Sequence, residues 1–165
     1  MDRNIKVIAL GGLDEKGKNC YAIEIEGDIF VIDAGVKFPD KLTPGIDYII
    51  ARFDYLFINK DKVRAYFITH GHDEVFGGLP YIIRKVPAPV YCTGVTKFMI
   101  ESFMLHNHLD LNIEFNIVKS GDSVMVSGRK ISFFGVAHNI PQSLGLAIST
   151  DYGSIIYIGS HIVNN

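Results

Sequence analysis

The sequence is poor in several features that would indicate other classes of protein. Only two of its 165 residues are cysteines, Cys20 and Cys92, and both lie in apolar, strand-like segments. Two such cysteines do not make a disulfide framework, so we expect a reducing compartment and a cytoplasmic protein. A net charge of -2 excludes a strong attraction to nucleic acid by bulk charge alone. No signal peptide, membrane-spanning apolar run, repeat or linker is present in the sequence.

The residues that are present predict a mixed α/β fold. An apolar fraction of 48% is enough for a packed core, and 165 residues suggest one domain or part of one. Hydrophobic alternation and turn residues predict the strands and helices. The expected strands are 5–10, 20–25, 29–32, 63–68, 90–93, 113–118, 123–126, 130–136, 143–150 and 154–158, and the expected helices are 53–59, 77–84 and 95–106. Gly27 and Asp28 are expected to form the turn of a hairpin.

Two histidines follow the strand expected at residues 63–68. His70 and His72 are two residues apart, so both can face one pocket and offer neutral nitrogens to zinc. A two-metal version of this turn would carry an aspartate at position 74 and a histidine at position 75. This chain has Glu74, whose carboxylate is displaced by its extra methylene, and Val75, which has no lone pair. The alternative is a polar loop in which the histidines bond to strand-end carbonyls.

Further candidate ligands follow other strand ends. His138 lies after the strand expected at 130–136 and, with the first pair, would make a three-histidine zinc set. Ser160 stands where a bridging carboxylate would be expected, and a neutral hydroxyl is a poor zinc ligand. The adjacent His161 compensates only if it turns inward, because neighbouring strand residues face opposite sides.

Two acidic positions have alternative interpretations. Asp33 ends the strand expected at 29–32, and it could orient a ligand histidine or bond to its own backbone in a turn. Asp73 and Glu74 are adjacent, so at most one of them faces a common pocket.

Five motifs along the chain resemble one family, ribonuclease J. This family consists of metallo-β-lactamase-fold ribonucleases with an inserted β-CASP domain. The matching residues are Gly11, Gly12, Leu13, Glu15, Gly17, Lys18 and Asn19; residues 31–35 with Lys37, Phe38 and Pro39; Gly45, Ile46 and Asp47; residues 69–72 with 77–81; and His138, Ile140, Pro141 and Ser143.

The resemblance implies an α/β/β/α sandwich of which this chain is the first half. Residues 1–165 would be the N-terminal part of a metallo-β-lactamase-like domain, without the β-CASP domain and the C-terminal half. The two-zinc site of the family is matched at His70, His72 and His138. It is not matched at Glu74, Val75 and Ser160, so the resemblance implies at most one weakly held zinc, or none.

These observations support two hypotheses about function. The first is a degenerate ribonuclease J subunit that binds RNA or an active paralogue and has lost most of its chemistry. The second is an enzyme with one zinc on His70, His72 and His138, with weak exo- or endoribonuclease activity. A hydrolase of small esters is a third reading, which the family-specific motifs disfavour. Metal content distinguishes the first two.

Overall fold

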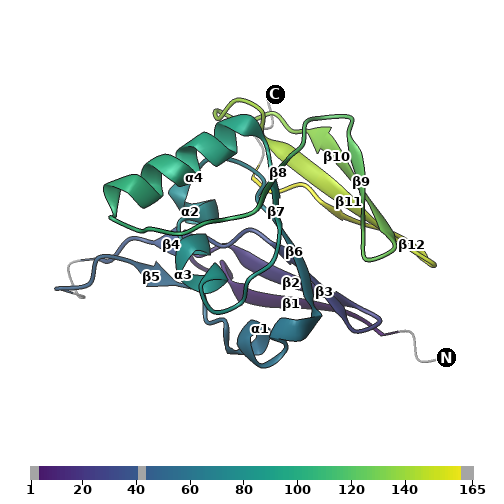
Figure 1. The fold of residues 1–165 in the computed structure, drawn as a ribbon, viewed down its shortest axis with the longest axis horizontal. Helices are drawn as coiled ribbons and strands as arrows, with labels where there is room; N and C mark the ends of the chain where they lie inside the picture. The colour runs from purple at the N-terminus through teal and green to yellow at the C-terminus, as the bar shows by residue number, and fades with distance from the viewer. Residues whose placement is uncertain (1–3, 41–43, 161–165) are drawn as a thin grey trace.

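Two β-sheets lie face to face in the computed structural model, which describes residues 4–40 and 44–160 (Figure 1). The first sheet has six strands in the order β1-β2-β3-β6-β7-β8 and the second has four in the order β12-β11-β10-β9. The first contains β1 (Ile5–Gly11), β2 (Cys20–Ile25), β3 (Asp28–Ile32), β6 (Val63–Phe67), β7 (Val90–Cys92) and β8 (Phe115–Ile117). The second contains β9 (Ser123–Val126), β10 (Arg129–Gly135), β11 (Leu144–Thr150) and β12 (Gly153–Tyr157). A two-stranded ribbon pairs β4 (Val36–Lys37) with β5 (Ile49–Ile50).

The helices cover the face of the six-stranded sheet that points away from the second sheet (Figure 1). They are α1 (Asp54–Ile58), the 3-10 turn η1 (Lys60–Lys62), α2 (Asp73–Phe76), α3 (Leu79–Ile83) and α4 (Gly94–His106). Within the described residues, no helix lies over the outer face of the four-stranded sheet. The layers are therefore helix, sheet and sheet.

Alternation along the central strands builds two cores. In β3, Ile29 and Val31 face the helices, while Phe30 and Ile32 face the second sheet. All four side chains are fully buried. A strand buried on both faces reads as a continuous apolar run, which is how residues 29–32 appear in the sequence.

Aromatic rings fill the space between the two sheets. Phe67 on β6 lies at ring-centroid distances of 6.5 Å from Phe30, 5.4 Å from Tyr91 and 6.0 Å from Phe133 of the second sheet. Its side chain is 1% exposed. These contacts hold β10 against β6, and the loops that follow those two strands carry the candidate site.

The predicted strands and all three predicted helices are present, with three local differences. The hairpin turn consists of Glu26 and Gly27, because Ile25 pairs with Asp28, so the prediction of a turn at Gly27 and Asp28 is wrong by one residue. Both turn residues have positive φ, 52° and 91°, the type I′ conformation that suits the strand twist. The helix expected at 77–84 is shorter and follows an unpredicted helix, α2. The ribbon of β4 and β5 was not predicted, because two-residue strands are too short to show an alternation of apolar and polar residues.

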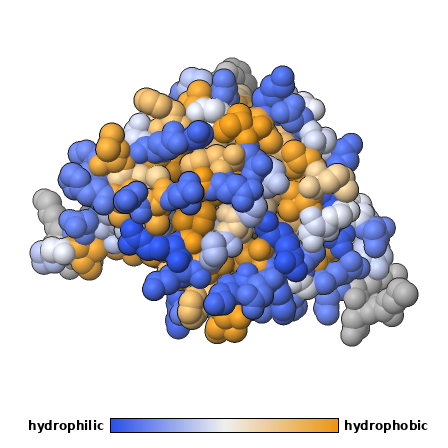
Figure 2. Space-filling view, viewed as in Figure 1, coloured by the Kyte–Doolittle hydropathy of each residue, from blue (hydrophilic) through white to orange (hydrophobic). Residues whose placement is uncertain are grey.

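The face drawn in Figure 2 mixes hydrophilic and hydrophobic residues, and some of the hydrophobic ones lie over α4. Phe98 and Leu105 on this helix are 66% and 79% exposed. Among the described residues, no helix is long and apolar enough to cross a membrane.

Replacing Phe67 by alanine tests the inter-sheet core. Removing this buried ring leaves a cavity between the sheets, so we expect the free energy of unfolding to fall by about 3–5 kcal/mol. The matched control is Phe98→Ala on the exposed face of α4, for which we expect a change below about 0.5 kcal/mol. Urea denaturation measures both, and equal losses would contradict the role assigned to Phe67.

Candidate metal centre

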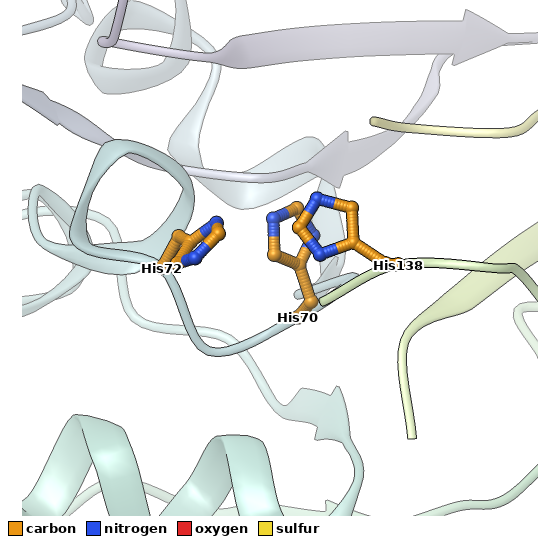
Figure 3. Close-up of side chains that lie close together, drawn as sticks. All are labelled: His70, His72 and His138. Atoms are coloured by element: carbon orange, nitrogen blue, oxygen red, sulfur yellow. The ribbon is translucent and has the colours of Figure 1, made fainter. Parts of the chain in front are cut away.

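Two loops bring three histidines to one end of the sheets (Figure 3). His70 and His72 lie between β6 and α2, and His138 follows β10 of the other sheet. Since β6 lies between the parallel strands β3 and β7, its carboxyl end opens where loops gather and ligands commonly bind. His70 is 2% exposed, whereas His72 and His138 are partly exposed.

The three imidazoles lie close enough to share an ion. Ring centroids are 5.0 Å apart for His70 and His72, 4.4 Å for His70 and His138, and 5.1 Å for His72 and His138. One ligand atom from each ring lies within 4.8 Å of the other two. Three neutral nitrogens and an open position are a common zinc arrangement.

A hydrogen-bond chain orients His70 from behind. The Thr69 Oγ1 atom lies 3.0 Å from Nδ1 of His70. The same hydroxyl lies 3.0 and 3.2 Å from the two carboxylate oxygens of Asp33, and the Thr69 backbone N–H donates to Asp33 at 2.9 Å. Tyr157 also donates its hydroxyl to Asp33, at 3.0 Å. Asp33 thus contacts Thr69 and Tyr157 and reaches His70 through Thr69.

The hydrogen bonds from Asp33 through Thr69 determine which nitrogen of His70 is free to bind a metal. When Asp33 is ionised, the single hydroxyl proton of Thr69 goes to its carboxylate, so the hydroxyl oxygen accepts from Nδ1–H of His70. The neutral ring then keeps its lone pair on Nε2, as a metal ligand requires. Nε2 is buried and has no hydrogen-bond partner among the described residues. An unpartnered buried lone pair beside two more imidazoles fits a metal ion.

His138 is less well prepared. The backbone N–H of Ile140 donates to its Nδ1 at 3.2 Å. A neutral imidazole that accepts at Nδ1 carries its proton on Nε2. Binding a metal through Nε2 therefore requires this hydrogen bond to break, which lowers the affinity of the set.

Burial favours the uncharged forms of His70 and His138. It lowers the pKa of His70 to about 4, with smaller contributions from His138 and His72. Burial also lowers the pKa of His138, assisted by His72. For Asp33, burial raises the pKa to about 7, although the hydrogen bonds from Thr69 and Tyr157 act in the opposite direction. Neutral imidazoles are available as ligands without first losing a proton.

The positions that depart from a two-metal pattern border the same pocket of about 250 Å³. Its lining includes His70, His72, Glu74, Val75 and Ser160. Val75 is 2% exposed and packs into the helix-side core. The Glu74 carboxylate lies 3.3 Å from the Lys16 ammonium. His161 lies outside the described residues, so its orientation remains a prediction.

Close backbone contacts hold the pocket wall in place. Gly35 packs against α2 so tightly that a Cβ atom there would lie 1.6 Å from the Glu74 carbonyl oxygen. Ala34 N–H donates to the Val75 carbonyl at 2.7 Å, and Gly78 N–H donates to the Ala34 carbonyl at 2.8 Å. Only glycine at position 35 allows α2 to approach the end of β3 this closely.

Sequence reasoning missed several residues of this site. Thr69 directly precedes His70, and this adjacency was a usable signal for its role. Tyr157, which lies 124 positions from Asp33, has no such signal. The Lys16–Glu74 pair and the Ile140 amide are likewise visible only in the folded chain.

The sequence pattern of the metallo-beta-lactamase superfamily matches residues 13–145, a stretch that includes His70, His72 and His138. The chain belongs to the metallo-β-lactamase superfamily. This membership confirms the α/β fold class expected from the sequence, and it agrees with a three-histidine cluster able to bind metal.

Relatives within the metallo-β-lactamase superfamily include proteins named Ribonuclease J 2. The one from Streptococcus pyogenes is 40% identical over 157 residues, which are 94% of this chain and 28% of that protein. The one from Staphylococcus aureus is 37% identical over 158 residues, 96% of this chain and 28% of that protein. The chain thus spans less than a third of these relatives, and its resemblance to ribonuclease J is confirmed over that part.

Solved structures share the fold at lower identity. A protein of unknown function from Enterococcus faecalis superposes with a TM-score of 0.68 at 16% identity, covering 95% of this chain and 43% of the other. Human tRNase Z, short form, superposes with a TM-score of 0.61 at 17% identity, covering 95% of this chain and 70% of the other. These likenesses support the metallo-β-lactamase fold.

Asp33 and His70 give opposite pH dependences to stability. The pKa of His70 is 6.5 in the unfolded chain and about 4 in the folded chain. This group therefore removes stability as the pH falls through that window. The pKa of Asp33 is about 7 in the folded chain and 3.8 in the unfolded chain. This group therefore adds stability as the pH falls through that window. The two effects offset each other in the wild type.

Asp33→Asn removes one of these effects. In the presence of a chelator, we expect the variant to lose about 2 kcal/mol more than the wild type between pH 7 and pH 5. Urea denaturation at both pH values measures the difference. A variant with the pH dependence of the wild type would contradict the buried-carboxylate assignment.

Proposed function

We propose that this protein is a ribonuclease J-like RNA-processing subunit with a reduced metal site, which binds RNA or an active paralogue and does little or no cleavage. The observation that carries the proposal is the set of side chains that line the pocket. His70 and His72, two of the three clustered histidines, line it together with a buried valine, a glutamate paired with lysine and a serine. The 40% identity to a protein named Ribonuclease J 2 supports RNA as the ligand.

The metal in this proposal is at most one weakly held zinc, for which His70, His72 and His138 are the ligands. Zinc would supply a Lewis acid and a water of lowered pKa. Thr69 and Asp33 fix the His70 tautomer, and the Ile140 amide opposes ligation by His138. The affinity should therefore be low, which fits a subunit retained for binding.

The alternative function is a weak single-zinc ribonuclease using the same histidines. The specific observation in its favour is Nε2 of His70, which is buried and unpartnered within the described residues while Nδ1 contacts the Thr69 hydroxyl. In this alternative, Asp33 and Thr69 position His70, as partners behind a ligand histidine commonly do. The cytoplasmic location expected from the sequence remains a prediction under both proposals.

Metal content tests the reduced site. We expect at most one zinc per chain by elemental analysis after dialysis against zinc. The triple variant Glu74→Asp, Val75→His and Ser160→Asp supplies ligands at positions that already line the pocket, so uptake should rise well above that of any single variant.

The control for the triple variant replaces the same positions without good zinc ligands. Glu74→Asn, Val75→Leu and Ser160→Asn have similar volumes and should leave uptake unchanged. Two stoichiometric zincs in the wild type, or equal uptake by the two triple variants, would contradict the proposal.

Activity separates the two functions. Without a second metal, both water activation and charge stabilisation at a phosphodiester are poorly supplied, so we expect no detectable RNA decay. His70→Ala should leave RNA binding and co-purification with an active paralogue nearly unchanged, and His70→Gln provides a variant that keeps polar character. RNA decay that the wild type catalyses and both variants lose would favour the single-zinc enzyme.

A further inference from the structure

One lysine faces the pocket that His70 and His72 line. Lys16 lines it together with His70, His72 and Glu74. Its side chain is 91% exposed, and its ammonium lies 3.3 Å from one carboxylate oxygen of Glu74, which is 31% exposed. An ion pair this exposed contributes little to stability, so either partner can exchange it for another ligand.

The other acidic residue of the pocket is already neutralised. Glu15 lies 2.9 Å from the Lys18 ammonium and 3.3 Å from the Lys37 ammonium. The hydrogen bond from Lys18 lowers the pKa of Glu15 more than any other contact. Among the described lining residues, Lys16 is therefore the lysine or arginine that an incoming anion meets.

The loop that carries Lys16 is fastened to the segment that carries Glu74. Asn19 N–H donates to the backbone carbonyl of Glu74 at 3.2 Å, and Lys18 N–H donates to the Val36 carbonyl at 2.9 Å. The two charged residues thus start from backbone positions that are fixed relative to each other. Exchange of partners requires only side-chain rotation.

An independent observation indicates that this pocket receives a ligand. His70 is 2% exposed, and its Nε2 atom has no hydrogen-bond partner within the described part of the chain. Buried polar atoms of this kind normally have a partner, and the lone pair of Nε2 needs a hydrogen-bond donor, which the ribose hydroxyls of RNA carry, or a metal ion.

We propose that Lys16 binds a phosphate group of RNA at the mouth of the pocket lined by His70 and His72, and that Glu74 competes with the phosphate for the Lys16 ammonium. The inference rests on the proposed RNA binding and adds the residue that recognises the phosphate. The ammonium is a compact, mobile charge suited to a phosphate oxygen. Glu74 pairs with the lysine when RNA is absent, and the weakness of this exposed ion pair lets a phosphate displace it.

The test is a double-mutant cycle on RNA affinity in the presence of EDTA. The variants are Lys16→Met, Glu74→Gln and the two combined, with Lys60→Met as the control. Lys60 is an exposed lysine in η1, at the opposite end of β6 from the histidines. The probe is a short fluorescein-labelled oligouridylate, and fluorescence anisotropy gives the dissociation constant at several salt concentrations. Thermal unfolding checks that each variant is folded.

We expect Lys16→Met to weaken binding roughly three- to tenfold and to reduce the salt slope by about 0.7, the contribution of one phosphate contact on a single strand. Lys60→Met should change neither quantity. Glu74→Gln should tighten binding, and by more in the presence of Lys16 than in its absence, because it frees the ammonium.

Each contrary result has its own meaning. If the wild type binds RNA and Lys16→Met weakens that binding no more than Lys60→Met does, this inference is overturned and the proposed function stands. A gain from Glu74→Gln that is equal with and without Lys16 would overturn the competition, because general charge repulsion would explain it. A wild type that does not bind the oligouridylate would overturn both the inference and the proposed RNA binding.

Discussion

A buried carboxylate holds this end of the molecule together. Asp33 is 1% exposed and accepts hydrogen bonds from Thr69 at the end of β6 and from Tyr157 at the end of β12. It therefore joins the six-stranded sheet to the four-stranded sheet at the point where the histidine loops begin. Leaving such a group without its donors would be costly, because a buried carboxylate has no water to replace them. The same contacts set the tautomer of His70, so the structural bond and the chemistry of the site depend on one residue.

Three further residues of the site make other contacts in the fold. Val75 packs into the helix-side core, Glu74 pairs with Lys16, and Nδ1 of His138 accepts from the Ile140 amide. Valine offers no ligand atom, and the other two contacts occupy a carboxylate and a lone pair that could otherwise bind metal. These contacts are the physical reason for the proposed reduced site, in which His70 is still oriented for a metal but a second ion has little support.

Local pattern predicted much of this fold, and it failed where tertiary contacts decide. Residues 29–32 and 63–68 were recognisable as strands because strands buried on both faces are continuously apolar. The hairpin turn was misplaced by one residue, since Gly27 is compatible with either turn position and the pairing of Ile25 with Asp28 selects between them. Helix α2 was missed because four residues are too few to show a helical period, and its position depends on the close approach to Gly35.

The sequence by itself determined the residue types of the site and the layers that carry it. The spacing of His70 and His72 after an apolar strand, and the substitutions at Glu74, Val75 and Ser160, were readable without coordinates. Only the tertiary structure decided that His138 joins the pair, that Thr69 and Tyr157 hold Asp33, and that Lys16 pairs with Glu74. The physical reason is that these contacts join segments far apart in the chain, and the packing of two sheets through Phe67 and its neighbouring rings sets their distances.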